Sequence, residues 1–237
     1  MATRLIAGLA FGASLLAVQA APAAADDALT DTERRWLAGA TPPVQWALEQ
    51  GLPIDIIVLP RAEANAAPLA MGFADGRCQL VFAMRGNPAA ESTLAAIPAP
   101  LLQATLEAMT AHEVGHCARH RSGAFDSLPA GLSDQPDTIE TSQPTAELQA
   151  MAREMRITRR EEAYADLVGL AWTHARHPEQ FSQVLAWFDT ARSDETPRGF
   201  HDTRHWLALA HAVDAFADRA SPLDQAATLW QHGLLDD

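Results

Sequence analysis

The first half of the chain alternates between short apolar runs and turn residues, a pattern typical of strands mixed with helix. Residues 31–50 carry two short helical patterns, broken by Pro42-Pro43. The Ile- and Val-rich stretch 52–60 is bounded by prolines and predicts a strand. In the stretch 71–88, two strand patterns flank Asp75-Gly76, a dipeptide favoured in tight hairpins. We therefore expect a small antiparallel sheet early in the chain.

The second half is dominated by apolar positions at helical spacing. One helix should start near Pro100 or Leu101 and run to His120. Another follows the capping residue Thr145, with a break near Ile157-Thr158. Three more are expected within residues 181–192, 203–219 and 223–233, the last capped by Ser221 and with Gly233 just past its end. A small early sheet followed by helices predicts an α+β fold that is predominantly α.

A long polar stretch, residues 121–144, separates the first two of these helices. It is rich in Ser, Asp, Gly and Pro, which marks a loop. Loops of this length inside a domain are usually functional or mobile. The sequence leaves open whether this loop is a lid, a plug or disordered.

The N-terminus is a separable segment. Arg4, an apolar run from Leu5 to Val18 and small residues up to Ala25 have the layout of a secretory signal peptide. The apolar run, about 14 residues, is too short for a comfortable membrane span. An uncleaved N-terminal anchor is the alternative. We expect residues 1–25 to be a signal peptide, residues 26–237 to form a single domain, and the mature protein to be periplasmic or secreted without a membrane span.

Charge and cysteine content narrow the possible partners and the compartment. The 237 residues carry a formal net charge of -13. Because neutralising phosphates requires a basic face, a nucleic-acid partner is not expected. The two cysteines, Cys78 and Cys117, could form one disulfide in an oxidising compartment or remain free thiols, and the sequence leaves both open.

The helix that ends near His120 carries the stretch AHEVGHCARH. His112 and His116 are four residues apart, so on a helix they differ by about 40° in azimuth and about 6 Å in rise. Both imidazoles can therefore reach one point beside the helix, and Glu113 borders that point, about 60° from His116. This H-E-x-x-H arrangement predicts a zinc site in which the glutamate acts as the base towards water.

The apolar stripe of the same helix favours a metal site over a helix with surface histidines. Leu102, Leu106 and Met109 share the azimuth of Glu113 and His116, so the polar cluster continues an inward-facing stripe. Ionisable groups on a buried face need a partner, and a metal ion supplies one. We expect one Zn²⁺ per chain.

A catalytic zinc requires a third protein ligand and an open fourth position. Arg119 and Ser122 stand where the longer metzincin motif would require Gly and His, which excludes that class. Among the later glutamates, only Glu162 has an aspartate four residues on, so Glu162 and Asp166 share one helical face. We expect Glu162 to be a ligand and Asp166 to fix the tautomer of a ligand imidazole. The alternatives are that Glu161 is the ligand or that Glu162 is only paired with an Arg.

Together, AHEVGHCARH and EAYAD resemble the motifs of gluzincin metallopeptidases, in the branch of CAAX endopeptidases and HtpX-like proteases. That branch commonly shows A-H-E-x-G-H-x-x-x-H, a later E-x-x-A-D, and an Asn-Ala pair ahead of an edge strand, matched here by Asn65-Ala66. The resemblance runs from about Asn65 to about Gly169. It implies a zincin-like domain, and the soluble periplasmic members are the closer comparison because the family's membrane spans are missing here.

The resemblance also implies a late histidine that stabilises the oxyanion, usually in a His-Pro motif with Arg six residues on. His201 is the candidate, although Asp202 stands in place of Pro. Arg204 is a candidate substitute cation, and Asn65 a candidate substrate contact. Alternatively, Asp202 or Thr203 caps the next helix and His201 is an exposed loop residue.

The remaining candidates are ordinary polar and aromatic positions on helices. His205 and Tyr164 are weaker rivals to His201, and His120 is expected to have a supporting role near the site. Structural roles are expected for the other histidines, His174, His177, His211 and His232.

These features predict a periplasmic or secreted zinc endopeptidase that acts on polypeptides, including misfolded exported proteins. A substrate would be held in extended form along the edge strand of the hairpin. The first alternative is a non-catalytic zinc-binding chaperone or adaptor with a gluzincin fold, its cleft blocked by the 121–144 loop. The second is a helical interaction protein in which the motif is fortuitous.

Overall fold

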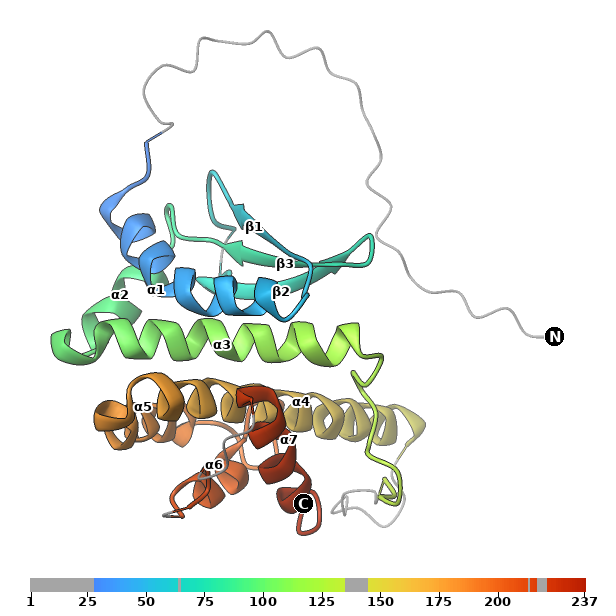
Figure 1. The fold of residues 1–237 in the computed structure, drawn as a ribbon. Coiled ribbons are helices and arrows are strands. Elements are labelled where there is room, and N and C mark those ends of the chain that lie inside the picture. The colour runs from blue at the N-terminus through green and yellow to red at the C-terminus, as the bar shows by residue number, and fades with distance from the viewer. Residues whose placement is uncertain (1–27, 64, 135–144, 213, 217–220) are drawn as a thin grey trace, which may run out of the picture.

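One helix, α3 (Leu102–Arg121), lies between two layers of secondary structure (Figure 1). The computed structural model describes residues 28–63, 65–134, 145–212, 214–216 and 221–237. On one side of α3 lie α1 (Asp31–Glu49), α2 (Pro88–Ala96) and a sheet; on the other lie α4 (Ala146–Arg176), α5 (Phe181–Ser193), α6 (Arg204–Ala210) and α7 (Pro222–Gly233). Two apolar cores, one in each layer, are separated by α3. The expectation of an α+β fold dominated by helix is confirmed.

The sheet has three strands, β1 (Ile54–Val58), β2 (Leu69–Ala74) and β3 (Arg77–Phe82), in the order β1-β3-β2. The hairpin of β2 and β3 is antiparallel, as expected, but β1 pairs with β3 in parallel. The expectation of a purely antiparallel sheet is therefore wrong in this respect. The chain returns after β1 and places β3 in the centre, where Cys78, Leu80 and Phe82 are buried.

The turn between β2 and β3 has the expected chemistry. Asp75 has φ 51° and Gly76 has φ 72°, so both central residues are left-handed, as a two-residue hairpin turn of the I′ type requires. The turn leaves β2 at the edge of the described sheet. In the adjoining pair, the Ala83 N–H donates to Pro68 O. Because alternate residues of an antiparallel strand face the partner, the backbone groups of Leu69, Met71 and Phe73 face the open edge.

Helix α1 is continuous, whereas the sequence predicted two pieces broken at Pro42-Pro43. Proline lacks the N–H that would bond the carbonyl four residues earlier. In the structure, Gln103 Nε2 lies 3.5 Å from Ala38 O, the carbonyl that Pro42 leaves free. A capping box between Thr30 and Glu33 fixes the start of the helix. Packing and capping therefore maintain this helix against its local preference.

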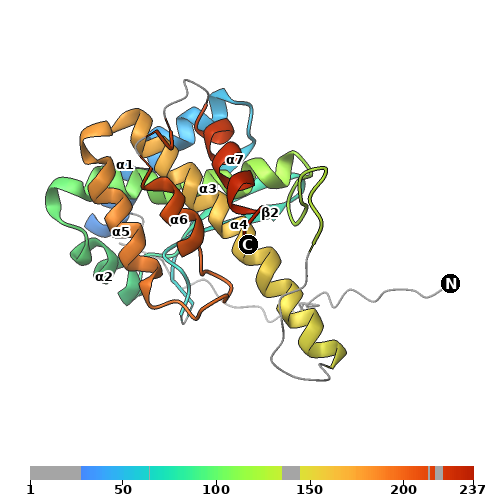
Figure 2. The same ribbon diagram turned by 90° about the horizontal axis from the view of Figure 1, so that it is seen from below.

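Helix α4 is unbroken over 31 residues, so the break predicted near Ile157-Thr158 is absent. Thr145 caps it, as expected, and its first turns extend past the other helices (Figure 2). Two glycines permit its close contact with α3. A Cβ on Gly115 would lie 3.1 Å from Ala165 Cα, and a Cβ on Gly169 would lie 2.6 Å from Ala108 O. The glycine inside the H-E-V-G-H stretch therefore brings α4 close to the two histidines.

The later helices follow the prediction with two corrections. The helix expected over 203–219 is only α6 (Arg204–Ala210); residues 213 and 217–220 lie outside the described chain. The chain turns at His211, and Phe216 is buried against His174 and Phe181. Ser221 caps α7 as expected, and Gly233 is the last residue of that helix rather than the one beyond it.

Cys78 and Cys117 form a disulfide, which resolves the alternative left open by the sequence. It joins the central strand to α3 at the residue after His116. The expected signal peptide lies outside the described residues. Across those residues, no helix combines the length and apolarity needed to cross a bilayer.

Candidate metal site

Two helices bring His112, His116 and Glu162 together as the sequence predicted. The Nε2 atoms of His112 and His116 are 3.1 Å apart. Glu162 Oε1 lies 3.3 Å from His116 Nε2, and Glu162 Oε2 lies 3.7 Å from His112 Nε2. One ligand atom from each residue falls within 4.8 Å of the others. Two imidazole nitrogens and a carboxylate oxygen form a group that could hold a metal ion.

Asp166 holds one of the two imidazoles in place. Its Oδ1 lies 2.8 Å from His112 Nδ1, so the Nδ1–H donates to the carboxylate and Nε2 faces His116 and Glu162. Asp166 is fully buried. Arg192 on α5 and Thr203, just before α6, complete its hydrogen bonds. By contrast, His116 Nδ1 is buried and has no hydrogen-bond partner within the described chain.

Glu113 lies beside the group, next to the edge strand. Its carboxylate accepts a hydrogen bond from the backbone N–H of Met71. Burial raises the pKa of Glu113, against the opposing effect of His112 and His116. A glutamate with a raised pKa beside two imidazoles is suited to take up a proton.

The electrostatics of the group favour a positive charge in its centre. Burial disfavours the charged form of His112, but the hydrogen bond and charge of Asp166 outweigh it and raise the pKa of His112 to about 9. Burial also opposes the ionised form of Glu162, but the two imidazoles lower its pKa to about 2. Three carboxylates, Glu113, Glu162 and Asp166, therefore surround one guanidinium and two imidazoles, an arrangement that a cation between them would stabilise.

A pocket opens beside His112 and Glu113. It has a volume of about 190 Å³. Its other walls come from β2, α3, α4 and α5, and most of their side chains are apolar: Leu69, Met109, Asp166, Trp187, Phe188, Ala191 and Arg192. An apolar pocket next to a few polar groups is the usual form of a binding site.

The sequence left open whether Glu161 is the ligand or Glu162 is only paired with an arginine, and the contacts of these two residues decide both questions. Glu161 points away from the histidines and pairs with Arg119, with Arg119 Nε 2.9 Å from Glu161 Oε2. Glu162 does bond an arginine, Arg192, but it also faces both imidazoles. Glu162 is therefore the carboxylate of the group, and its arginine is part of the same site.

The three candidates for oxyanion or substrate contacts, Arg204, His201 and Asn65, lie outside the group formed by His112, His116 and Glu162. Arg204 Nε donates to Asp202 Oδ1 at 2.7 Å and is substantially exposed. His201 is exposed in the turn before α6, and no described contact joins its side chain to the group. Asn65 is exposed and has φ 64°. None of the three meets His112, His116 or Glu162 here, so their roles stay predictions.

The other histidines and Tyr164 have structural contacts. His120 stacks on Phe73 with ring centroids 3.9 Å apart, which supports the edge strand next to the site. Tyr164 OH lies 3.4 Å from Leu223 O, on the α7 side of α4. The partners of the rest are Phe181 for His174, Glu107 for His177, Gly233 O for His205 and Asp189 for His211, while His232 is exposed.

The sequence analysis missed Arg192 and the contact of Thr203 with Asp166. Arg192 Nη2 lies 3.2 Å from Glu162 Oε2 and 2.9 Å from Asp166 Oδ1. Both residues are distant from the motifs in the chain and match no local pattern. The one available signal was that Glu162 and Asp166 form an acidic pair on one helical face, which calls for a buried cation.

Comparisons with protein-family models, with curated proteins and with solved structures find no match to this chain.

Proposed function

We propose that the protein is a zinc-dependent endopeptidase that acts on exported polypeptides. The observation that carries the proposal is the convergence of His112, His116 and Glu162 beside Glu113. Two neutral imidazoles and one carboxylate are the ligand set of catalytic zinc sites of the His₂Glu type, which leave one position open. The resemblance of AHEVGHCARH and EAYAD to gluzincin motifs supports the same assignment.

The donor set fits zinc better than magnesium or calcium. Imidazole suits zinc and other late transition metals, whereas Mg²⁺ and Ca²⁺ take oxygen ligands. Zinc, when bound, would supply Lewis acidity that lowers the pKa of water and polarises a carbonyl. His112 and His116 would present Nε2 atoms to it, with Asp166 holding the His112 ring.

The chain's own groups would then divide the work of hydrolysis. Glu113 would take a proton from the attacking water and give it to the leaving amine, a role suited to its raised pKa. The outward-facing backbone groups of Leu69 and Phe73, together with the Met71 carbonyl, would pair with an extended peptide. The pocket beside His112 would take one of its side chains.

Cleavage of an unfolded protein such as casein tests the proposal. We expect cleavage by the full chain that stops with a chelator and returns with Zn²⁺, and one zinc per chain by metal analysis. Glu113→Gln should abolish cleavage while zinc is retained. Glu154→Gln, an exposed change on α4, is the matched control and should cleave normally.

Two outcomes would contradict the proposal. Equal cleavage by Glu113→Gln would mean that the mechanism is wrong. Zinc binding together with client binding, but without cleavage by the wild type, would favour a chaperone or adaptor.

A further inference from the structure

Thr203 has an unusual place in the structure. It occupies the N-cap position of α6, where a threonine hydroxyl normally accepts a hydrogen bond from a backbone N–H of the first turn. Thr203 makes no such capping bond in the described structure. Its Oγ1 instead donates to Asp166 Oδ2 at 2.6 Å, and both side chains are fully buried. The hydroxyl therefore forms a hydrogen bond with Asp166 instead of capping α6.

We propose that Thr203 is a positioning residue of the metal site, which orients His112 by fixing the carboxylate of Asp166. The proposal rests on the proposed metal-binding role of His112. Asp166 Oδ1 receives His112 Nδ1 and Arg192 Nη2, whereas Oδ2 receives Arg192 Nε and Thr203 Oγ1. Four donors to two oxygens fix the carboxylate plane, and that plane sets the direction of the His112 ring.

Thr203 and Arg192 both donate to Asp166 Oδ2, but they differ in their other contacts. Arg192 also bonds Glu162 Oε2, at 3.2 Å, so its position depends on the state of that carboxylate. Thr203 bonds only Asp166 in this site. Its hydroxyl therefore holds Oδ2 independently of changes at Glu162.

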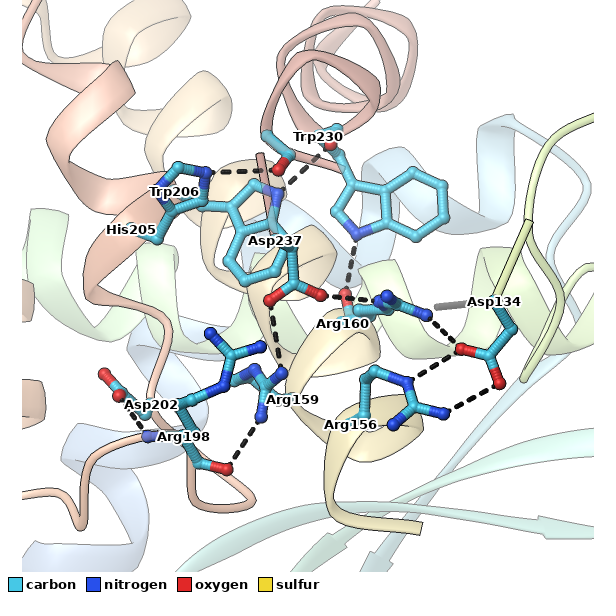
Figure 3. A network of polar contacts seen from close by, with 11 residues as sticks. Asp134, Arg156, Arg159, Arg160, Arg198, Asp202, His205, Trp206, Trp230 and Asp237 are labelled. Carbon is cyan, nitrogen blue, oxygen red and sulfur yellow. Dashed lines mark hydrogen bonds and ion pairs between the residues drawn. The ribbon is translucent and has the colours of Figure 1, made fainter. Parts of the chain in front are cut away.

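The segment before Thr203 is anchored to α4 by its own polar contacts (Figure 3). Arg159 Nη1 donates to Arg198 O at 2.7 Å. Asp202 Oδ2 accepts the Arg198 N–H at 2.7 Å, which closes the turn. After Thr203, Trp206 Nε1 donates to Trp230 O at 3.1 Å, which joins α6 to α7. These contacts place the Thr203 hydroxyl at a fixed distance from α4.

The two imidazoles of the group differ in this support. His112 is held through Asp166, whereas His116 Nδ1 has no partner among the described residues. Among the described residues, a hydrogen bond at Nδ1 therefore orients the ring of His112 but not that of His116. Loss of the Thr203 hydroxyl should consequently reduce metal affinity even though Thr203 touches no proposed ligand.

Zinc affinity of the full chain, measured by competition with a chelator, tests the proposal. Thr203→Val removes the hydroxyl with little change in shape, and we expect it to weaken Zn²⁺ binding by about 10-fold, the lower end of the effect seen for direct partners of metal ligands. Thr203→Ser keeps the hydroxyl and should stay within about threefold of the wild type. Thr173→Val is the matched control, because Thr173 is equally buried on α4 but its hydroxyl bonds Gly169 O.

A second measurement reports on His112 directly. Ring ¹⁵N shifts of the zinc-free protein, recorded at a pH above the pKa of His112, should show the neutral ring with its proton on Nδ1, and Thr203→Val should mix in the other tautomer. If Thr203→Val does not fold, Thr203→Ala gives the same comparison.

The proposal is overturned if the hydroxyl-free variant binds zinc like the wild type, or if Thr173→Val loses as much affinity. A wild type without zinc affinity overturns it together with the proposed function. A wild type that binds zinc but cleaves nothing overturns only the endopeptidase assignment, since affinity remains the readout for Thr203.

Discussion

Arg192 forms a two-pronged contact with Asp166: its Nε lies 3.0 Å from Oδ2 and its Nη2 lies 2.9 Å from Oδ1. The geometry matches the fork of a guanidinium to a carboxylate. Burial disfavours the charged forms of both groups, but their attraction outweighs it, raising the pKa of Arg192 and lowering that of Asp166. This ion pair therefore ties α5 to the residue that orients His112.

Arg192→Ala should destabilise the protein more than any exposed arginine change. It would leave Asp166 buried without its cation, and breaking a buried pair in this way costs about 3–5 kcal/mol. Arg204→Ala, which removes a solvent-screened surface pair with Asp202, should have a much smaller effect on stability. Urea unfolding with and without Zn²⁺ measures both. Equal losses from the two variants would show that Arg192 has no special role.

Glu162→Gln and Glu161→Gln make the same chemical change at neighbouring residues with different partners. Glu162 faces the two imidazoles, so its variant should lose most zinc affinity. Glu161 pairs with Arg119, so its variant should lower the free energy of unfolding but retain zinc. Metal analysis and thermal melting of both variants test this. If Glu162→Gln retained zinc, the third ligand would have to be a residue other than Glu162.

Opening the Cys78–Cys117 disulfide should reduce stability. The bridge spans a sequence separation of 39, and the loop-entropy model assigns such a bridge about 4 kcal/mol. Because Cys117 follows His116, we also expect weaker zinc binding on reduction. The melting temperature and zinc affinity of the double variant Cys78→Ser/Cys117→Ser should be measured and compared with those of the oxidised wild type. An unchanged melting temperature would mean that packing alone holds β3 to α3.

Asp134 should contribute stability that depends on pH. Hydrogen bonds from Arg156, and then from Arg160, outweigh partial burial and lower its pKa to about 2. A carboxyl whose pKa is lower in the folded state contributes fully above its unfolded pKa, about 3.9, and loses that contribution as the pH falls towards 2. Wild type and Asp134→Asn should therefore differ in melting temperature at pH 6 and converge towards pH 2. A constant difference across this range would show that Asp134 stays ionised or is not paired.

Local pattern predicted the parts of the molecule that depend on neighbours in sequence. The Asp75-Gly76 turn, the Thr145 cap and the His112–His116 spacing each follow from a few adjacent residues. Glu162 could be selected because Asp166 lies one turn later on the same face. These are properties of a single strand or helix.

What the sequence could not supply depends on contacts between distant segments. Pro42 breaks a helix by local rules, but packing against α3 keeps α1 whole. The parallel pairing of β1 with β3 joins segments that are separated in the chain by the whole of β2, so no single local turn sets it. Arg192 and Thr203 lie 26 and 37 residues from Asp166 in the chain, and no local sequence pattern near either residue predicts the contact.

The neighbouring residues Glu161 and Glu162 point to different partners because consecutive side chains on a helix are about 100° apart. Glu161 engages Arg119, on α3 itself, while Glu162 faces the imidazoles of that same helix. These two contacts together fix the rotation of α4 about its own axis relative to α3. One amino acid inserted near the start of α4 can be accommodated at the projecting end of that helix. One inserted after Glu161 would turn Glu162 away from His112 and His116, so the two contacts could no longer form together.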